Sequence, residues 1–242
     1  MLIMFVAPAI LAILAMGLFA VVLPDQHLPV KPPPMTLAQW VTTFWVSPRE
    51  HPDFGLAWLS RFLIILATFM FTTYRLFFVQ DRIHLPTDEA VAAISTGVLI
   101  YTIALVASGY VAGYISDRTG RRKVLVASSA VIFGLGTAVL AHVSTLSGFY
   151  VAEAIMGFAY GIYMGVDLAL VVDVLPNPDD SGKDLGVFNI ANALPQTLAP
   201  IVGAFFLSIN SIPKQNYTML LWAAGIAAII GGIVVLPIKK AK

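Results

Sequence analysis

Residues 113–123 read Gly-Tyr-Ile-Ser-Asp-Arg-Thr-Gly-Arg-Arg-Lys and separate two long apolar segments. The stretch has the form G-x-x-x-D-R-x-G-R-R-K and combines glycines, a carboxylate and a basic cluster. Gly120 permits a tight turn, because glycine adopts backbone conformations that are closed to other residues. A basic turn between two apolar segments is typical of a cytoplasmic loop, where Lys and Arg accumulate and contact anionic headgroups.

The composition of the whole chain indicates a membrane protein. Hydrophobic residues make up 59% and charged residues 11% of the 242 residues, whereas soluble domains carry about 25% charged residues. The mean hydropathy is +0.87, so too little polar surface remains to cover a water-exposed globule. The net charge of +1 gives no bias toward nucleic acid. The absence of cysteine excludes disulfides, thiolate metal sites and a cysteine nucleophile.

Seven apolar runs are long enough to cross a hydrocarbon core of roughly 30 Å as helices. They lie at 1–23, 57–80, 91–115, 124–143, 147–175, 185–208 and 217–238. The sequence therefore predicts an all-α integral membrane protein, a polytopic helical bundle. The first run has no basic residue before it and no obvious cleavage site, so we interpret it as a retained span and not as a signal peptide.

The distribution of basic residues predicts the orientation of the chain. One set of alternating loops contains Lys31, Arg49, Arg118, Arg121, Arg122, Lys123, Lys183, Lys239, Lys240 and Lys242. The opposite set contains Arg82 and Lys214, while Arg61 lies at the membrane edge on the basic side. By the positive-inside rule, the first set is cytoplasmic. We therefore expect the C-terminus in the cytoplasm and the N-terminus outside.

The stretch 113–123 resembles the signature loop of the major facilitator superfamily, which joins the second and third helices of a six-helix half. The resemblance covers nearly the whole chain and implies the C-terminal half of that fold plus one preceding transmembrane helix. The implied parts are 1–23 as the family's sixth helix, 24–56 as the central cytoplasmic loop, 57–238 as the six-helix half and 239–242 as a basic cytoplasmic tail. Within 24–56, aromatic residues at helical spacing near 36–46 predict an interfacial helix or a plain linker.

This resemblance leaves the first five helices of the family fold without a counterpart. Solute in such transporters lies between two halves that move against each other. We therefore expect the chain to work with a missing N-terminal half or a second copy, or to be a truncated reading frame. The lipid bilayer and a small-molecule solute are the other expected partners, and the expected location is a bacterial-type cytoplasmic membrane.

In the family, the signature loop acts as a conformational latch that helps close the cytoplasmic side. The resemblance assigns this role to Gly113, Asp117, Arg118, Gly120, Arg121 and Arg122. The alternative is that these charges only determine topology. Asp117 lies at a helix C-terminus, where the helix dipole disfavours a negative charge. We therefore expect it to have a partner, either a nearby arginine or the N-terminus of another helix.

The span 147–175 carries the most deeply placed carboxylate of the chain. Asp167 lies roughly 12 Å from the inner end of this span, and Glu153, Tyr160 and Asp167 fall on one helix face. Because charged groups at membrane depth are costly and usually functional, we predict a proton-coupling or substrate-binding role for Asp167. The alternative is a structural carboxylate that pairs with a basic residue or a hydroxyl.

Three glycines of the same span, Gly157, Gly161 and Gly165, form a small-residue face that permits close helix contact. The contact serves either static packing or a flexing gate.

Two further spans contain polar candidates. Asn189, Asn192 and Gln196 share one face of the span 185–208, beside prolines that interrupt its backbone hydrogen bonds. These amides suit hydrogen bonds to a polar solute or contacts between helices. Arg75 in the span 57–80 either helps to bind substrate or extends its charged end to the headgroups.

The resemblance implies a secondary transporter that works by alternating access, coupled to H⁺ or Na⁺. Residues 173–196, DVLPNPDDSGKDLGVFNIANALPQ, look like bacterial sugar-type cation symporters, which implies a small polar solute such as a sugar. The alternatives are a drug–proton antiporter half and a non-transporting fragment that associates with a partner. The sequence contains no P-loop, no metal-binding spacing and no supported catalytic triad. We expect neither an enzyme nor a bound cofactor.

Overall fold

The computed structural model of the chain describes residues 2–23, 36–37, 45–176, 181–210 and 215–241. The described residues form α1 (Leu2–Val22), α3 (Pro52–Arg82), α4 (Thr87–Thr119), α5 (Arg122–His142), α6 (Leu146–Val174), α7 (Ser181–Ser208) and α8 (Tyr217–Val235). Each of these helices is long and apolar enough to span a membrane. The prediction of an all-helical, polytopic protein is therefore confirmed. The predicted interfacial helix near 36–46 lies mostly outside the described residues.

Several helices extend beyond the predicted spans. α3 begins at Pro52, where the ring of a first-turn proline is compatible with the helix. α4 continues to Thr119 and ends at Gly120, whose φ of 65° lies in the left-handed region. Hydropathy marks only the length that lies in hydrocarbon, whereas these helices continue into the more polar boundary layer. The signature loop is thus mostly helix, and its turn is confined to Gly120 and Arg121.

The chain divides into two compact units, residues 1–40 and 41–242. In the first unit, α1 exposes all of its described side chains and is apolar all round. A helix that is apolar on every side is typical of a membrane span.

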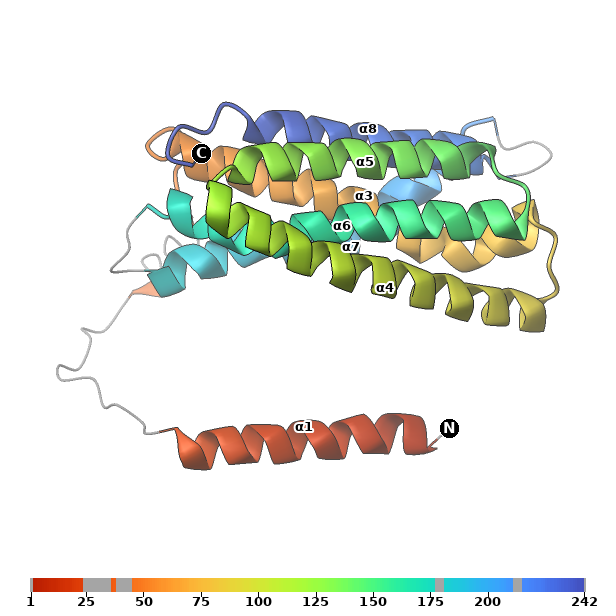
Figure 1. Ribbon diagram of the computed structural model, residues 1–242, viewed down its shortest axis with the longest axis horizontal. Coiled ribbons are helices and arrows are strands. Elements are labelled where there is room, and N and C mark those ends of the chain that lie inside the picture. The colour runs from red at the N-terminus through yellow and green to blue at the C-terminus, as the bar shows by residue number, and fades with distance from the viewer. Residues whose placement is uncertain (1, 24–35, 38–44, 177–180, 211–214, 242) are drawn as a thin grey trace. The chain divides into compact units, whose positions relative to one another are not determined.

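The second unit consists of two groups of three helices, α3–α5 and α6–α8. α4 packs against α6 of the other group, and α7 packs in the same way against α3. α5 also contacts α6, α8 contacts α3, and α5 and α8 lie side by side, as Figure 1 shows. Exchanging the two groups therefore reproduces each of the contacts just named. Successive helices cross the membrane in alternating directions. Because the first group has an odd number of helices, the second group starts from the opposite side of the membrane and is inverted relative to the first.

The closest helix contact lies between α4 and α6. A Cβ atom added to Gly161 would collide with the backbone carbonyl of Leu105 and the hydroxyl of Ser108. A Cβ atom on Gly165 would likewise meet the carbonyl of Gly109. The prediction that these glycines let a neighbouring helix approach is confirmed.

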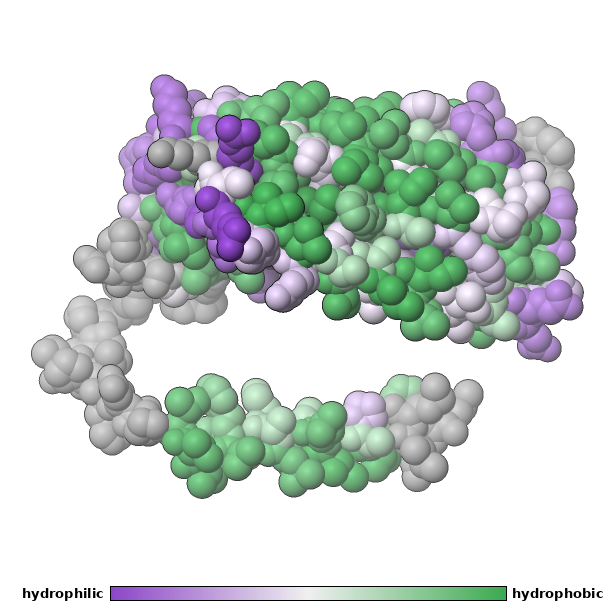
Figure 2. All heavy atoms as spheres, in the orientation of Figure 1, coloured by the Kyte–Doolittle hydropathy of each residue, from purple (hydrophilic) through white to green (hydrophobic). Residues whose placement is uncertain are grey.

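The surface of this second unit has an apolar belt between two hydrophilic ends, as the space-filling view in Figure 2 shows. Such a belt is what a membrane-embedded bundle requires. Of its six helices, α4 and α7 are the least buried within the unit. Their outer faces are therefore available to lipid or to further protein.

Candidate functional site

One buried ion pair joins α3 to α6 near the end of the bundle that carries the turn between α4 and α5. The Nη1 atom of Arg61 lies 2.9 Å from Oδ2 of Asp167, and both side chains are largely buried. The guanidinium carbon of Arg61 also lies 5.0 Å from the ring centre of Phe188 in α7. Asp167 thus has the basic partner that one of the two sequence interpretations expects.

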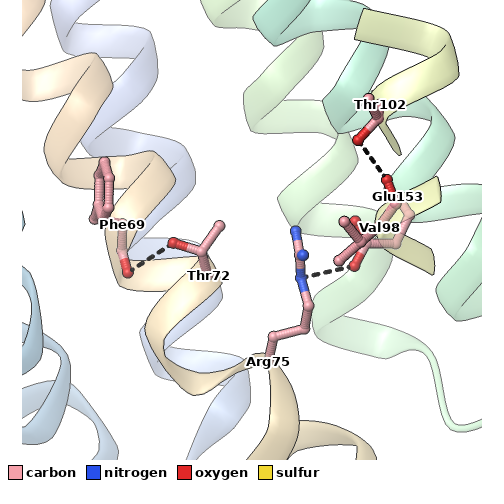
Figure 3. A network of polar contacts seen from close by, with 6 residues as sticks. All are labelled: Phe69, Thr72, Arg75, Val98, Thr102 and Glu153. Carbon is pink, nitrogen blue, oxygen red and sulfur yellow. Dashed lines mark hydrogen bonds and ion pairs between the residues drawn. The ribbon is translucent and has the colours of Figure 1, made fainter. Parts of the chain in front are cut away.

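A second ion pair joins the same helices toward their other end. The Nε atom of Arg75 lies 2.9 Å from Oε1 of Glu153, and the Glu153 side chain has no solvent exposure. Figure 3 shows the guanidinium of Arg75 reaching from α3 to this carboxylate. The interpretation that Arg75 extends its charge to the headgroups is wrong, because the arginine is directed into the bundle and is only 9% exposed.

Aromatic rings surround this second pair. The guanidinium carbon of Arg75 lies 4.6 Å from the ring centre of Phe71 and 5.6 Å from that of Tyr101. Both distances lie within the range of cation–π attraction. Although Arg75 and Glu153 are in contact, neither oxygen of this carboxylate makes a well-aligned hydrogen bond with a described residue. The cation is thus held by two rings and by a carboxylate with spare acceptor capacity.

A row of tyrosines runs between the two ion pairs. The rings of Tyr101 and Tyr160 lie 6.3 Å apart, and those of Tyr160 and Tyr163 lie 5.8 Å apart. Asp167 lies four residues after Tyr163 and seven after Tyr160, on the same face of α6. The structure thus brings Glu153, Tyr160 and Asp167 together in one connected cluster, as their shared helix face predicts.

The two ion pairs have equal spacing along both helices. Arg61 and Arg75 are 14 residues apart, and so are Glu153 and Asp167. Because α3 and α6 are antiparallel, equal spacing lets each arginine meet a carboxylate. At 1.5 Å per residue, the pairs are separated by about 21 Å along the helix axis.

The position of Arg61 in the sequence indicates only a charge at the membrane edge, and its pairing with Asp167 is established by the structure. Tyr101 and Tyr163, which lie in the row between the two pairs, carry no distinguishing pattern in the sequence. The equal spacing of two arginines in one span and two carboxylates in another is the sequence signal that identifies the pairing.

The amides of α7 lie apart from this cluster. Asn189 and Gln196 are exposed and Asn192 is half-buried, so the three form a polar row on an open face of the helix. The Gln196 side chain donates a hydrogen bond to the backbone carbonyl of Asn192 at 3.1 Å. Within the described residues, no hydrogen bond or ion pair joins this row to the arginine–carboxylate pairs.

The signature loop divides into residues bound within the bundle and residues that project from it. Arg122 forms an ion pair with Asp173 of α6 and donates a hydrogen bond to the Ala169 carbonyl at 2.8 Å. Gly113 packs against the backbone of Gly165.

Three charged positions of the loop, Asp117, Arg118 and Arg121, face outward. Arg118 and Arg121 are exposed, and the guanidinium of Arg118 lies 4.5 Å from the ring centre of Tyr114. Asp117 is exposed, and the expected arginine or helix N-terminus that would partner it is absent from the described part of the chain.

The described residues contain no cluster of side chains suited to binding a metal ion. No three His, Asp or Glu side chains among them lie close enough together to bind a metal ion.

Comparison with known proteins identifies a family. The model of the Major Facilitator Superfamily matches residues 2–177 and 88–242. An uncharacterised transporter of this type from Schizosaccharomyces pombe is 26% identical over 66% of the chain and 36% of its own length. Multidrug resistance protein MdtL from Klebsiella pneumoniae is 30% identical over 50% of the chain and 30% of its own length. The bacillibactin exporter of Bacillus subtilis is 28% identical over 48% of the chain and 30% of its own length. The chain thus spans little more than a third, or less, of each of these relatives.

Proposed function

Because the chain belongs to the Major Facilitator Superfamily, we propose that it forms part of a secondary transporter that moves a small organic solute by alternating access. The chain is an integral membrane protein with apolar helices of membrane-spanning length. Its relatives are transporters, so it is not an enzyme.

The observation that carries this proposal is the polar row on α7. Asn189, Asn192 and Gln196 lie at membrane depth on an open helix face. Uncharged amides on a face that met only lipid would lose hydrogen bonds that water supplies elsewhere. A face of this kind suits a water-filled passage in which the amides exchange hydrogen bonds with a passing solute.

The same proposal requires a second half. α4 and α7 are the least buried helices of the six-helix unit, and α7 carries the polar row. We assign the outer face of α7, and the part of α4 that faces away from α5, to contact with further helices, supplied by a longer polypeptide, another chain or a second copy. The solute then passes between this unit and the second half, with the end that bears Arg118 and Arg121 in the cytoplasm.

Proton coupling is assigned to the buried carboxylates of α6. Asp167 and Glu153 each face one arginine of α3, so protonation of either carboxylate would release its arginine. Such a release changes the charge distribution inside the bundle and favours a different arrangement of helices. The tyrosines between the two carboxylates connect them through polarisable, hydroxyl-bearing side chains.

The direction of transport is proposed to be outward. The relatives whose names state a function are a multidrug resistance protein and a bacillibactin exporter. Exchange of an organic solute for protons therefore has more support than uptake of a sugar with a cation. Sugar symport stays a prediction from the likeness of residues 173–196.

Proton-flux assays in vesicles separate these functions. The full-length native protein is reconstituted and exposed to lipophilic cations in one series and to sugars in another. Proton release from the vesicles that depends on the organic cation supports antiport. Proton uptake that depends on a sugar supports symport instead, and the absence of any solute-dependent flux or counterflow overturns the transport proposal.

Asp167→Asn is expected to lower the rate of gradient-driven transport at least about tenfold, because the amide cannot take up or release a proton. Solute exchange, which needs no net proton movement, should be spared. The measurement compares gradient-driven flux with counterflow in the same vesicles, over a range of pH. Glu89→Gln, which removes an exposed carboxylate in the first turn of α4, serves as the control. An Asp167→Asn protein with normal driven flux and unchanged pH dependence would exclude the coupling role.

A further inference from the structure

A long apolar groove runs along the outside of the bundle between α4 and α5, with α6 as its floor. Its volume is about 290 Å³. The groove is lined by Ala104, Ala107, Ser108, Val111, Ala112, Ile115, Leu125, Phe158 and Ile162. The hollow arises because α4 presents small residues there and because α4 and α5 make little contact with each other. Figure 2 shows that the surface over these helices is mainly apolar.

The length of the groove matches one leaflet of a membrane. Along α4 it extends from Ala104 to Ile115, which are 11 residues apart and therefore separated by about 16 Å. Half of a hydrocarbon core of roughly 30 Å is about 15 Å. A single acyl chain that descends from the headgroup layer to the midplane would fill this length.

The end of the groove near Ile115 and Leu125 bears positive charge. Arg118 lies one helical turn beyond Ile115, and Arg121 lies one turn before Leu125. Both arginines are exposed, and no ion pair with a described carboxylate engages either of them. Their basic neighbours are already engaged, since Arg122 pairs with Asp173 and the Lys123 ammonium donates to the Ile238 carbonyl. Hydrophilic side chains gather over this turn in Figure 2.

The first turn of α5 adds to the positive potential at this place. It contains no acidic residue, and its N-cap residue Arg121 provides no side-chain cap. No side chain of this turn therefore neutralises the positive end of the helix dipole, and the nearby exposed carboxylate of Asp117 lies four residues before Arg121. The tyrosine ring of Tyr114 orients the Arg118 guanidinium by a cation–π contact.

We propose that this groove is a binding site for an anionic phospholipid. One acyl chain lies between α4 and α5, and the headgroup phosphate is bound by Arg118 and Arg121. A phospholipid combines an acyl chain that spans one leaflet with an anionic phosphate. The groove matches both, because it has the apolar length of one leaflet and two arginines at its polar end. The site does not depend on the identity of the transported solute.

Native mass spectrometry of the detergent-solubilised chain, titrated with phosphatidylglycerol or phosphatidylcholine, tests the site. The unaltered chain is expected to retain one phosphatidylglycerol roughly thirtyfold more tightly than phosphatidylcholine, given two arginines near the phosphate. The double variant Arg118→Gln with Arg121→Gln should lose this preference. Ala107→Phe, which fills the groove, should lose retention of both lipids. Arg49→Gln and Gly186→Phe change exposed residues elsewhere and should bind as the unaltered chain does.

Three results would overturn the proposal. Equal retention of the two lipids by the unaltered chain would leave no role for the arginines. A preference that survives in the double arginine variant would locate the anionic site elsewhere. A change in oligomeric state with Ala107→Phe, without loss of lipid, would make the groove an interface between copies of the chain.

Discussion

Glu153→Gln is expected to destabilise the folded protein by about 3–5 kcal/mol, the usual consequence of leaving one charge of a buried pair without its partner. The Glu153 side chain is completely buried and its one ionic partner among the described residues is Arg75, itself only 9% exposed. The rings of Phe71 and Tyr101 hold the guanidinium in place, so it cannot readily reach water. The measurement is the unfolding midpoint in a fixed detergent micelle.

Two companion variants separate a buried-charge effect from general damage. Asp173→Asn breaks an ion pair near the surface, in which the Arg122 side chain is 24% and the Asp173 side chain 30% exposed. This variant should lower the free energy of unfolding by less than about 1 kcal/mol. The double variant Glu153→Gln with Arg75→Met removes both charges and should recover most of the lost stability. A double variant less stable than Glu153→Gln alone would show that the arginine does not depend on this carboxylate.

Gly161→Val is expected to cost at least about 3 kcal/mol, or to prevent folding, because the new Cβ atom would collide with the backbone of α4 at Leu105. Flexible side chains can rotate away from a collision, but a backbone carbonyl moves only if the whole helix moves. The two helices would then separate along their closest contact. Yield of monodisperse protein and the unfolding midpoint measure the effect.

Gly186→Val in α7 is the matched control for this prediction. It introduces the same β-branched side chain into a helix, but nothing lies within 4 Å of the added Cβ atom. Because valine has a slightly higher helix propensity than glycine, the effect of this variant on stability should stay within about 1 kcal/mol and should not be a marked loss. Equal losses at the two positions would mean that the contact between α4 and α6 is not tight. Gly161→Ala should fall between the two valine variants.

Much of the fold could be predicted because membrane spans obey a simple rule of length and hydropathy. All seven predicted spans correspond to helices, and the glycines of 147–175 correctly predicted a close helix contact. Helix ends were less predictable, as α4 shows by extending through most of the signature loop to Thr119. Hydropathy indicates which residues lie in the hydrocarbon core, but a helix can continue beyond the edge of that core.

The site was predicted less completely because pairing depends on relations between helices. The shared face of Glu153, Tyr160 and Asp167 followed from the period of a single helix. Their arginine partners lie on α3, and a single span contains no information about the neighbour it will face. Arg75 was therefore ambiguous until the crossing of α3 and α6 positioned it beside Glu153.

The equal spacing of the two ion pairs has a consequence for movement. Arg61 with Asp167 and Arg75 with Glu153 each join one three-helix group to the other, at levels about 21 Å apart. Two attachment points at different depths oppose both tilting and sliding of the groups relative to each other. The six helices from α3 to α8 should therefore move as one rigid body while both carboxylates are charged. If one carboxylate of α6 lost its charge, the remaining ion pair would act as a pivot between the two groups. The charge states of Asp167 and Glu153 should therefore determine whether the unit is stiff or hinged.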